Sequence, residues 1–235
     1  MNIIAIIQAR MSSQRCPGKV LHQILGKNTL QFIIERLKHI SLLSDIYVAT
    51  SNKKSDLPVK KFCDDNNINC FQGSLNDVAG RFYSLLKTSP CDAFVRVNGD
   101  SPLIDNNLIS QGIRIFIDGN YDLVTNVLTR TYPKGQSVEV IKSETFQKTY
   151  LKMNNSEDLE HVTKYFYNNQ DKFKIKNFES KKQLENIQLS VDTYDDMRMF
   201  ESIVHKMDKP HWMYSLDDIL DIYWDIIWKK SLKQE

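Results

Sequence analysis

The chain contains few cysteines, no long apolar run and no large excess of charge of either sign. Its four cysteines form no C-x-x-C pair and have no histidine cluster beside them at zinc spacing: Cys16, Cys63, Cys70 and Cys91. This excludes the usual zinc patterns and favours reduced thiols in the cytoplasm. No segment reaches the roughly 18–20 apolar residues that span a bilayer. The N-terminal apolar run has no basic lead and continues directly into Arg10, so we interpret it as a buried strand rather than a signal peptide.

Positive and negative charges are nearly balanced. The 31 Lys and Arg residues and 29 Asp and Glu residues give a formal net charge of +2, and the two signs are interspersed. A nucleic-acid-binding protein usually carries a larger basic excess. We therefore expect a cytoplasmic protein with neither nucleic acid nor membrane as a partner. A length of 235 residues fits a single α/β domain.

Short apolar runs alternate with segments of helical periodicity in the first half of the chain. The pattern predicts strands at 3–7, 45–50, 70–71, 93–97 and 121–125, and helices at 29–40, 57–65, 77–86 and 107–116. This order is typical of an α/β protein with a mainly parallel sheet and helices on both faces. Ligands of such sheets bind outside the carboxyl ends of the strands.

The pattern changes after about residue 129. We expect strands at 137–141, 173–178 and 187–191, the last two in a smaller sheet, and helices at 157–167, 195–205 and 216–228. The single domain then divides into a nucleotide-binding core (1–128), an acceptor-binding and candidate dimer lobe (129–190), and a closing segment (191–235). Aromatic residues near the last helix favour a homodimer, although packing on its own domain is the plainer alternative: Trp212, Tyr214, Trp224 and Trp228.

A basic segment with small residues, QARMSSQRCPGK (Gln8 to Lys19), follows the first strand. Small residues let backbone N–H groups approach an anion, and the cations Arg10, Arg15 and Lys19 neutralise it. The segment matches neither the P-loop nor the G-x-G-x-x-G pattern. Its spacing fits a phosphate-binding loop and an ordinary basic surface loop equally well.

Two aspartates follow apolar strand-like segments in the same manner. Asp100 comes after FVRV and Asn98-Gly99, and Asp192 comes after LSV. Two carboxylates brought to one sheet edge are natural ligands for Mg²⁺, which keeps several waters and binds phosphate oxygens. The alternative for each aspartate is a turn residue or a helix N-cap.

Six blocks of the sequence, in order, resemble the cytidylyltransferases of the spore coat polysaccharide protein SpsF type, relatives of the CMP-sialate and CMP-KDO synthetases. The blocks are IIQARMSSQRCPGKVL, GSLNDVAGRFY, RVNGDSPLID, TYPKGQSVEVI, EHVTKYFY and LSVDTYDD. They span most of the chain. The resemblance implies a Rossmann-like nucleotidyltransferase fold of the GT-A-like type, CTP as donor and release of pyrophosphate.

The resemblance also implies roles for individual residues. Arg10 and Lys19 match positions that grip the triphosphate, and Asp100 and Asp192 match acids that hold a catalytic Mg²⁺. The remaining nucleotide-binding candidates come from the basic segment and from the ends of three later strands: Gln8, Ala9, Met11, Ser12, Ser13, Arg15, Thr50, Ser51, Asn52, Asn76, Asp77, Arg81 and Asn98. We name no protein base, because phosphoryl-type transfer needs mainly positioning and charge neutralisation.

The acceptor side is expected from 130–139 and from the helix that contains residue 160. Its candidates are Arg130, Tyr132, Lys134, Gly135, Glu139 and His161. Lys134 is a candidate contact for an anionic acceptor, and Glu139 and His161 for hydroxyls; core packing, a solvated turn and a helix-surface imidazole are the alternatives for Tyr132, Lys134 and His161.

The chain departs from the usual family pattern at Cys16 and Ser101, which look like packing changes, and at Lys134 and Gln136-Ser137 in the acceptor block. These last departures leave the acceptor open between a sugar acid and a phosphorylated small molecule, in surface polysaccharide synthesis.

Two other functions compete with this one. A nucleotide-sugar glycosyltransferase of GT-A type is expected to carry a D-x-D motif, whereas the chain has Asn98-Gly99-Asp100. A non-enzymatic nucleotide sensor is expected to have lost a phosphate-gripping cation or an acid, and all four of these residues are present.

Overall fold

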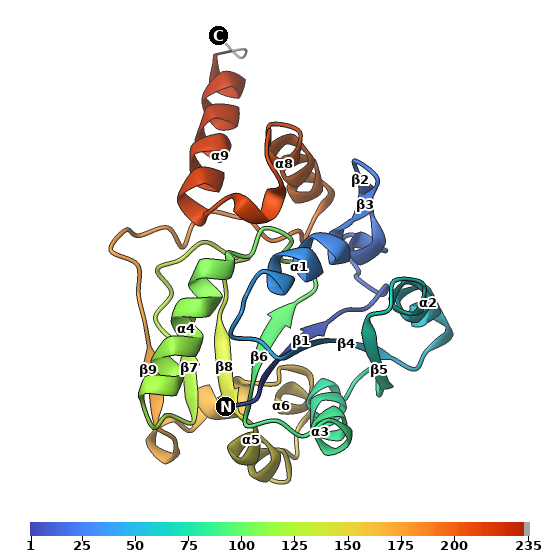
Figure 1. Ribbon diagram of the computed structural model, residues 1–235, viewed down its shortest axis with the longest axis vertical. Helices are drawn as coiled ribbons and strands as arrows, with labels where there is room; N and C mark the ends of the chain where they lie inside the picture. The colour runs from blue at the N-terminus through green and yellow to red at the C-terminus, as the bar shows by residue number, and fades with distance from the viewer. Residues whose placement is uncertain (233–235) are drawn as a thin grey trace.

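The computed structural model describes residues 1–232 and contains one seven-stranded sheet in the order β5-β4-β1-β6-β8-β7-β9 (Figure 1). The bounds of these strands are β1 (Ile3–Gln8), β4 (Asp45–Ser51), β5 (Asn69–Gly73), β6 (Ala93–Asn98), β7 (Leu123–Thr125), β8 (Glu139–Lys142) and β9 (Ile175–Asn177). β5, β4, β1 and β6 run parallel, β8 is antiparallel to both β6 and β7, and β9 is parallel to β7. The α/β class with a mainly parallel sheet is therefore confirmed.

Alternation along β1 shows how the sheet acquires two covered faces. Ile3, Ala5 and Ile7 belong to one buried cluster and Ile4 and Ile6 to the other, as expected for successive residues of a strand. The first cluster lies under α1 (Thr29–Lys38), α2 (Leu57–Asp65) and α4 (Asn106–Asp118); the second lies under α3 (Val78–Thr88), α5 (Ser143–Tyr150) and α7 (Lys164–Asn168). Because helices cover both faces, the strand ends are where the sheet opens to ligands.

The C-terminal segment packs on the first cluster. It contains α8 (Tyr194–Val204), η4 (His211–Met213) and α9 (Leu216–Ser231), and both α helices begin with a capping box. α9 projects from the body of the molecule (Figure 1). Tyr214 is buried, whereas Trp224 and Trp228 are exposed; the homodimer stays a prediction. No helix within residues 1–232 is long and apolar enough to cross a membrane.

The second half of the chain differs from the expected pattern in three places. The expected helix 157–167 is two short helices, α6 (Ser156–Glu160) and α7, because the chain leaves helical geometry at His161 and then buries Val162. The strand expected at 173–178 forms, as β9, but joins the main sheet through β7 rather than a smaller one. Within the described chain, 187–191 forms no strand, and its one isolated bridge joins Gln188 to Lys134.

Short elements without a clear periodicity were missed. They are α5, the 3-10 helices η1 (Lys19–Leu21), η2 (Lys54–Asp56), η3 (Gln170–Lys172) and η4, and the hairpin of β2 (Gln23–Ile24) and β3 (Lys27–Asn28). The hairpin turns through Leu25 and Gly26, both at positive φ. The residues that α5 buries are Ser143, Phe146 and Thr149, of which only Phe146 is apolar, so its sequence has no apolar stripe to recognise.

Candidate active site

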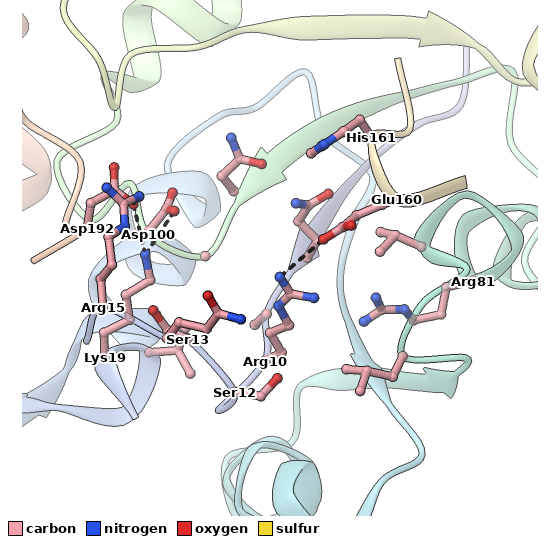
Figure 2. A pocket seen from close by; sticks show the side chains of 18 of the residues that line it. Arg10, Ser12, Ser13, Arg15, Lys19, Arg81, Asp100, Glu160, His161 and Asp192 are labelled. Atoms are coloured by element: carbon pink, nitrogen blue, oxygen red, sulfur yellow. Dashed lines mark hydrogen bonds and ion pairs between the residues drawn. The ribbon is translucent and has the colours of Figure 1, made fainter. Parts of the chain in front are cut away.

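A cleft of about 740 Å³ lies at the carboxyl ends of β1 and β6 (Figure 2). It is bounded by the loop after β1, which we call the basic loop (residues 9–19), by the start of α3, and by the end of α6. Of the predicted nucleotide-binding residues, those that line it are Gln8, Ala9, Arg10, Ser12, Ser13, Arg15, Lys19, Asn76, Arg81, Asn98 and Asp100, together with Asp192. The structure thus brings the basic loop and the two acids to one place.

The basic loop is folded around the backbone of Met11. The Met11 carbonyl accepts hydrogen bonds from the backbone N–H groups of Ser13 and Gly18, each at 3.0 Å. Gly18 adopts a φ of 73°, which glycine tolerates without steric cost. Met11 therefore supports the loop through its backbone and is not part of the cleft lining formed by the described residues.

Asp56 holds the basic loop from below. It is fully buried, accepts a hydrogen bond from the Met11 N–H at 2.7 Å, and accepts another from the Ser51 hydroxyl. A carboxylate that receives a backbone N–H makes a charge-assisted bond stronger than a neutral one. The sequence pattern did not single out Asp56, since its only local signal is an aspartate ahead of a helix.

Lys19 joins the two acids that we call the carboxylate pair, Asp100 and Asp192. Its ammonium nitrogen lies 3.1 Å from Asp100 Oδ2, 3.3 Å from Asp192 Oδ1 and 2.6 Å from the Val191 carbonyl oxygen. Arg15 adds a contact of 3.0 Å to Asp192 Oδ1. Figure 2 shows the ammonium group below both carboxylates. The turn that follows β6 and the segment that follows Leu189 thus converge on one cation.

The carboxylate pair fits a magnesium ion better than a metal that needs a dense cage of protein ligands. Residues 1–232 hold no cluster of three or more His, Cys, Asp or Glu side chains with metal-binding geometry. Mg²⁺ is commonly bound by one or two carboxylates and completes its shell with water and substrate phosphates. An oxygen-only pair beside an anion-binding loop is this kind of donor set.

Arg10 and Arg81 bring two guanidinium groups to the other end of the cleft (Figure 2). Arg10 forms an ion pair of 3.4 Å with Glu160 of α6. The sequence did not identify Glu160 as a site residue. Arg81 is 2% exposed, donates to the Ala49 carbonyl oxygen at 3.3 Å, and has an Nε group that meets no hydrogen-bond acceptor in the described chain. Burial, with the nearby charge of Arg10, lowers the pKa of Arg81 to about 10. An anionic ligand would favour the charged form of Arg81 and so oppose this lowering of its pKa.

Besides Met11, four predicted nucleotide-binding residues lie outside the lining that the described residues form. Thr50 and Ser51 are fully buried at the end of β4, and the Ser51 hydroxyl donates its hydrogen bond to Asp56. Asn52 is exposed and pairs its backbone with Gly73. Asp77 caps α3 by accepting the Gly80 N–H at 2.6 Å and also accepts the Tyr150 hydroxyl at 2.8 Å. Partial burial, and then this hydrogen bond, raise the pKa of Tyr150 to about 12. The end of β4 supports the loop instead of facing the ligand.

A second cavity of about 280 Å³ adjoins the cleft and shares Asn98 and His161 with it. Arg130 lines this cavity, donates to Ser137 Oγ at 3.1 Å, and has an Nη1 group for which residues 1–232 supply no acceptor. Burial lowers the pKa of Arg130. A partly buried guanidinium whose buried Nη1 group has free hydrogen-bonding capacity favours an anionic ligand.

Glu139 also lines the second cavity, but its carboxylate is already engaged. It is 2% exposed, pairs with Arg96, and accepts the Tyr167 hydroxyl at 2.5 Å. Burial raises the pKa of Glu139, but the charge of Arg96 and the hydrogen bonds outweigh this and lower it overall. Arg96 in turn donates to Gln8 at 3.0 Å. Glu139 therefore anchors a network that joins the two cavities. The sequence did not identify Arg96 and Tyr167 as members of this network, because their patterns are those of an ordinary strand residue and an ordinary helix residue.

Three predicted acceptor residues lie away from both cavities as lined by the described chain. Tyr132 packs on Phe178 with ring centroids 6.0 Å apart, as in its core-packing alternative, and Lys134 is exposed. Gly135 has a φ of 92°, and a Cβ there would lie 2.5 Å from the Ser190 nitrogen. The Tyr-Pro-Lys-Gly turn thus joins the backbone at 187–189 instead of aiming a side chain at a ligand.

The departures at 136 and 137 have different consequences. Gln136 is fully buried, accepts the Asp105 N–H at 2.9 Å and donates to the Leu103 carbonyl oxygen at 2.7 Å. It therefore ties down the segment that follows Asp100. Ser137, in contrast, lines the second cavity and accepts a hydrogen bond from Arg130, so it is the departure that lies in this cavity.

An α/β sheet with a basic loop and a carboxylate pair at one edge, and no P-loop, is the arrangement expected of a nucleotidyltransferase. A family model described as cytidylyltransferase matches residues 4–223. The chain belongs to the cytidylyltransferase family and is a CTP-dependent nucleotidyltransferase.

Similar proteins agree with this family. The chain is 35% identical to the uncharacterized protein MJ1063 of Methanocaldococcus jannaschii, over 88% of this chain and 85% of that protein. It is 26% identical to the spore coat polysaccharide biosynthesis protein SpsF of Bacillus subtilis, over 87% of each. A solved cytidylyltransferase of Leptospira borgpetersenii matches with a TM-score of 0.90 and 27% identity, over 98% of this chain and 96% of that one. The family favours transfer of a nucleotidyl group over the glycosyltransferase and nucleotide-sensor alternatives.

Proposed function

We propose that the protein transfers CMP from CTP to an anionic sugar acid with release of pyrophosphate, in a Mg²⁺-dependent reaction that serves surface polysaccharide synthesis. The observation that supports this most is the convergence of Lys19, Asp100 and Asp192 at the edge of the cleft. A triphosphate carries about four negative charges, and the basic loop supplies cations and backbone N–H groups to meet them.

The chain's own residues account for most of the catalysis. Arg10, Arg15 and Lys19 hold the triphosphate and neutralise the charge that moves onto the leaving pyrophosphate. Asp100 and Asp192 would hold Mg²⁺, which when bound draws charge from the α-phosphate oxygens and is worth several kcal/mol. The acceptor hydroxyl forms a bond to the α-phosphorus, the bond from that phosphorus to the bridging oxygen breaks, and the hydroxyl proton leaves to solvent. Holding the acceptor oxygen in line supplies the remaining effect.

The second cavity supports an acid as the acceptor. It lies beside the cleft, and Arg130 offers the free Nη1 group described above. A phosphorylated small molecule that attacks through a phosphate oxygen is the second candidate, favoured by the same guanidinium. Arg130 would hold the anionic group while His161 and Asn98, at the junction of the two cavities, face the attacking oxygen.

The proposal is tested by incubating the protein with each of the four ribonucleoside triphosphates, Mg²⁺ and panels of sugar acids and phosphorylated acceptors, and measuring pyrophosphate. We expect release with CTP and a sugar acid and its loss when EDTA is added. Release with phosphorylated acceptors alone would replace the sugar acid by the second candidate. No release with any acceptor, or an undiminished rate in EDTA, would contradict the proposal.

A further inference from the structure

The cations of the basic loop are bound to carboxylates of the chain itself. Lys19 contacts both members of the carboxylate pair, Arg15 contacts Asp192, and Arg10 contacts Glu160. Two of these cations and the carboxylate pair therefore form a group of four charges whose sum is zero. A free divalent cation gains little attraction from a neutral group, since opposing contributions cancel at similar distances.

Lys19 occupies the position that a metal ion would need. Its side chain is only 10% exposed, and its ammonium group is held by one oxygen each from Asp100, Asp192 and the Val191 carbonyl. This all-oxygen set is of the kind that binds Mg²⁺. An ammonium group and a divalent cation cannot share these oxygens closely, because their like charges repel at short range.

A triphosphate changes this balance. Its roughly four negative charges give Lys19 and Arg15 alternative partners, and their departure leaves the carboxylate pair with two uncompensated charges. We infer that Lys19 gates the metal position: it neutralises Asp100 and Asp192 until a nucleotide draws it away, so that the metal ion and CTP bind together. The inference rests on the proposed function, because it takes the carboxylate pair as the metal site.

The inference is tested by titrating Mn²⁺ into the protein without nucleotide and following the electron paramagnetic resonance signal of free Mn²⁺. Lys19→Gln removes the charge but keeps a polar side chain, and we expect it to bind Mn²⁺ at least tenfold more tightly than the unmodified protein. Lys19→Arg keeps the charge and is expected to behave as the unmodified protein. Lys182→Gln, which removes an exposed lysine paired with Asp217 at 3.5 Å, is the matched control and is expected to change nothing.

Affinity of Lys19→Gln within twofold of the unmodified protein, or weaker, would overturn the inference. The double variant Lys19→Gln, Asp100→Asn is expected to lose the gain, and a gain that persists would place the metal elsewhere and also overturn it. If circular dichroism shows that Lys19→Gln does not fold, Mn²⁺ is titrated into the unmodified protein with and without the α,β-methylene analogue of CTP. Tenfold tighter binding with the analogue supports the inference, and equal binding overturns it. Since no pyrophosphate is measured, failure here is separate from failure of the proposed reaction.

Discussion

Replacing Asp56 by alanine removes the one buried carboxylate seen to hold the basic loop from the side of β4. The change leaves the Met11 N–H, now bonded at 2.7 Å, and the Ser51 hydroxyl without their shared acceptor. A buried donor that loses its partner costs about 1–3 kcal/mol. Asp56 also lies near Arg81 and raises its pKa against the effect of burial, so the variant also weakens the charge balance of the cleft.

Two separate effects are expected from this change. The free energy of unfolding should fall by roughly 2–3 kcal/mol, which for a chain of this size lowers the melting temperature by about 5–10 °C. The loosened loop should raise the KM for CTP by roughly tenfold, the equivalent of about 1.4 kcal/mol. The acceptor KM should stay unchanged, because the second cavity does not include Asp56.

The assay is steady-state release of pyrophosphate with CTP or acceptor varied, together with a thermal melt of each variant. Asp56→Asn is the informative control: its amide oxygen can still accept the Met11 N–H and its NH₂ group can donate to Ser51. We expect it to restore most of the CTP KM. Asp64→Ala removes an exposed aspartate paired with Lys60 on α2 and should alter neither quantity. A CTP KM within twofold of normal in Asp56→Ala, despite a lowered melting temperature, would refute the positioning role.

Two further outcomes follow from the second cavity and from a buried histidine. Arg130→Gln should raise the acceptor KM at least about tenfold in steady-state kinetics, because it removes a charge-assisted contact, and leave the CTP KM unchanged; an equal rise in both would contradict an acceptor role. Burial lowers the pKa of His211 from 6.5 to about 4, even though Glu35 raises it. The neutral form of His211 therefore stabilises the fold above pH 6.5. Up to roughly 3 kcal/mol of the free energy of unfolding should be lost as the pH falls toward 4. Urea unfolding at several pH values should show this loss in the unmodified protein and a smaller loss in His211→Gln. The same dependence of the free energy of unfolding on pH in both proteins would contradict the prediction.

The parts of the site that the sequence predicted are those tied to strand ends. The apolar run of β1 places the basic loop at the carboxyl edge, and the runs before Asp100 and Asp192 bring both acids to the same edge. For the basic loop and Asp100 this inference needs only the parallel order of the strands; Asp192 follows a buried segment that joins no strand of the main sheet. It succeeded because each of these residues lies within a few positions of a recognisable buried segment.

The parts that the sequence did not predict depend on which way a polar side chain turns. Ser51 ends a strand as Asp100 nearly does, but its hydroxyl turns inward to Asp56. Gln136 lies in the acceptor block and yet is fully buried between Leu103 and Asp105. The partners of Gln136 lie more than thirty residues away in the sequence, and even Asp56, five residues after Ser51, lies on another element, so no local periodicity reports either contact. The prediction of the residues that line the second cavity was incomplete for the same reason. Arg96 and Tyr167 meet at Glu139 only once β6, β8 and α7 are packed.

The central claim is that the carboxylate pair assists transfer of CMP in the cleft, and the most direct measurement is single-turnover conversion of CTP labelled at the α-phosphate. The label should move to the acceptor in the unmodified protein with Mg²⁺. In Asp100→Asn and in Asp192→Asn at saturating Mg²⁺, the rate should fall by more than about 100-fold, in line with the several kcal/mol that metal assistance contributes. A near-normal rate in either variant, with the label still moving to the acceptor, would contradict the claim.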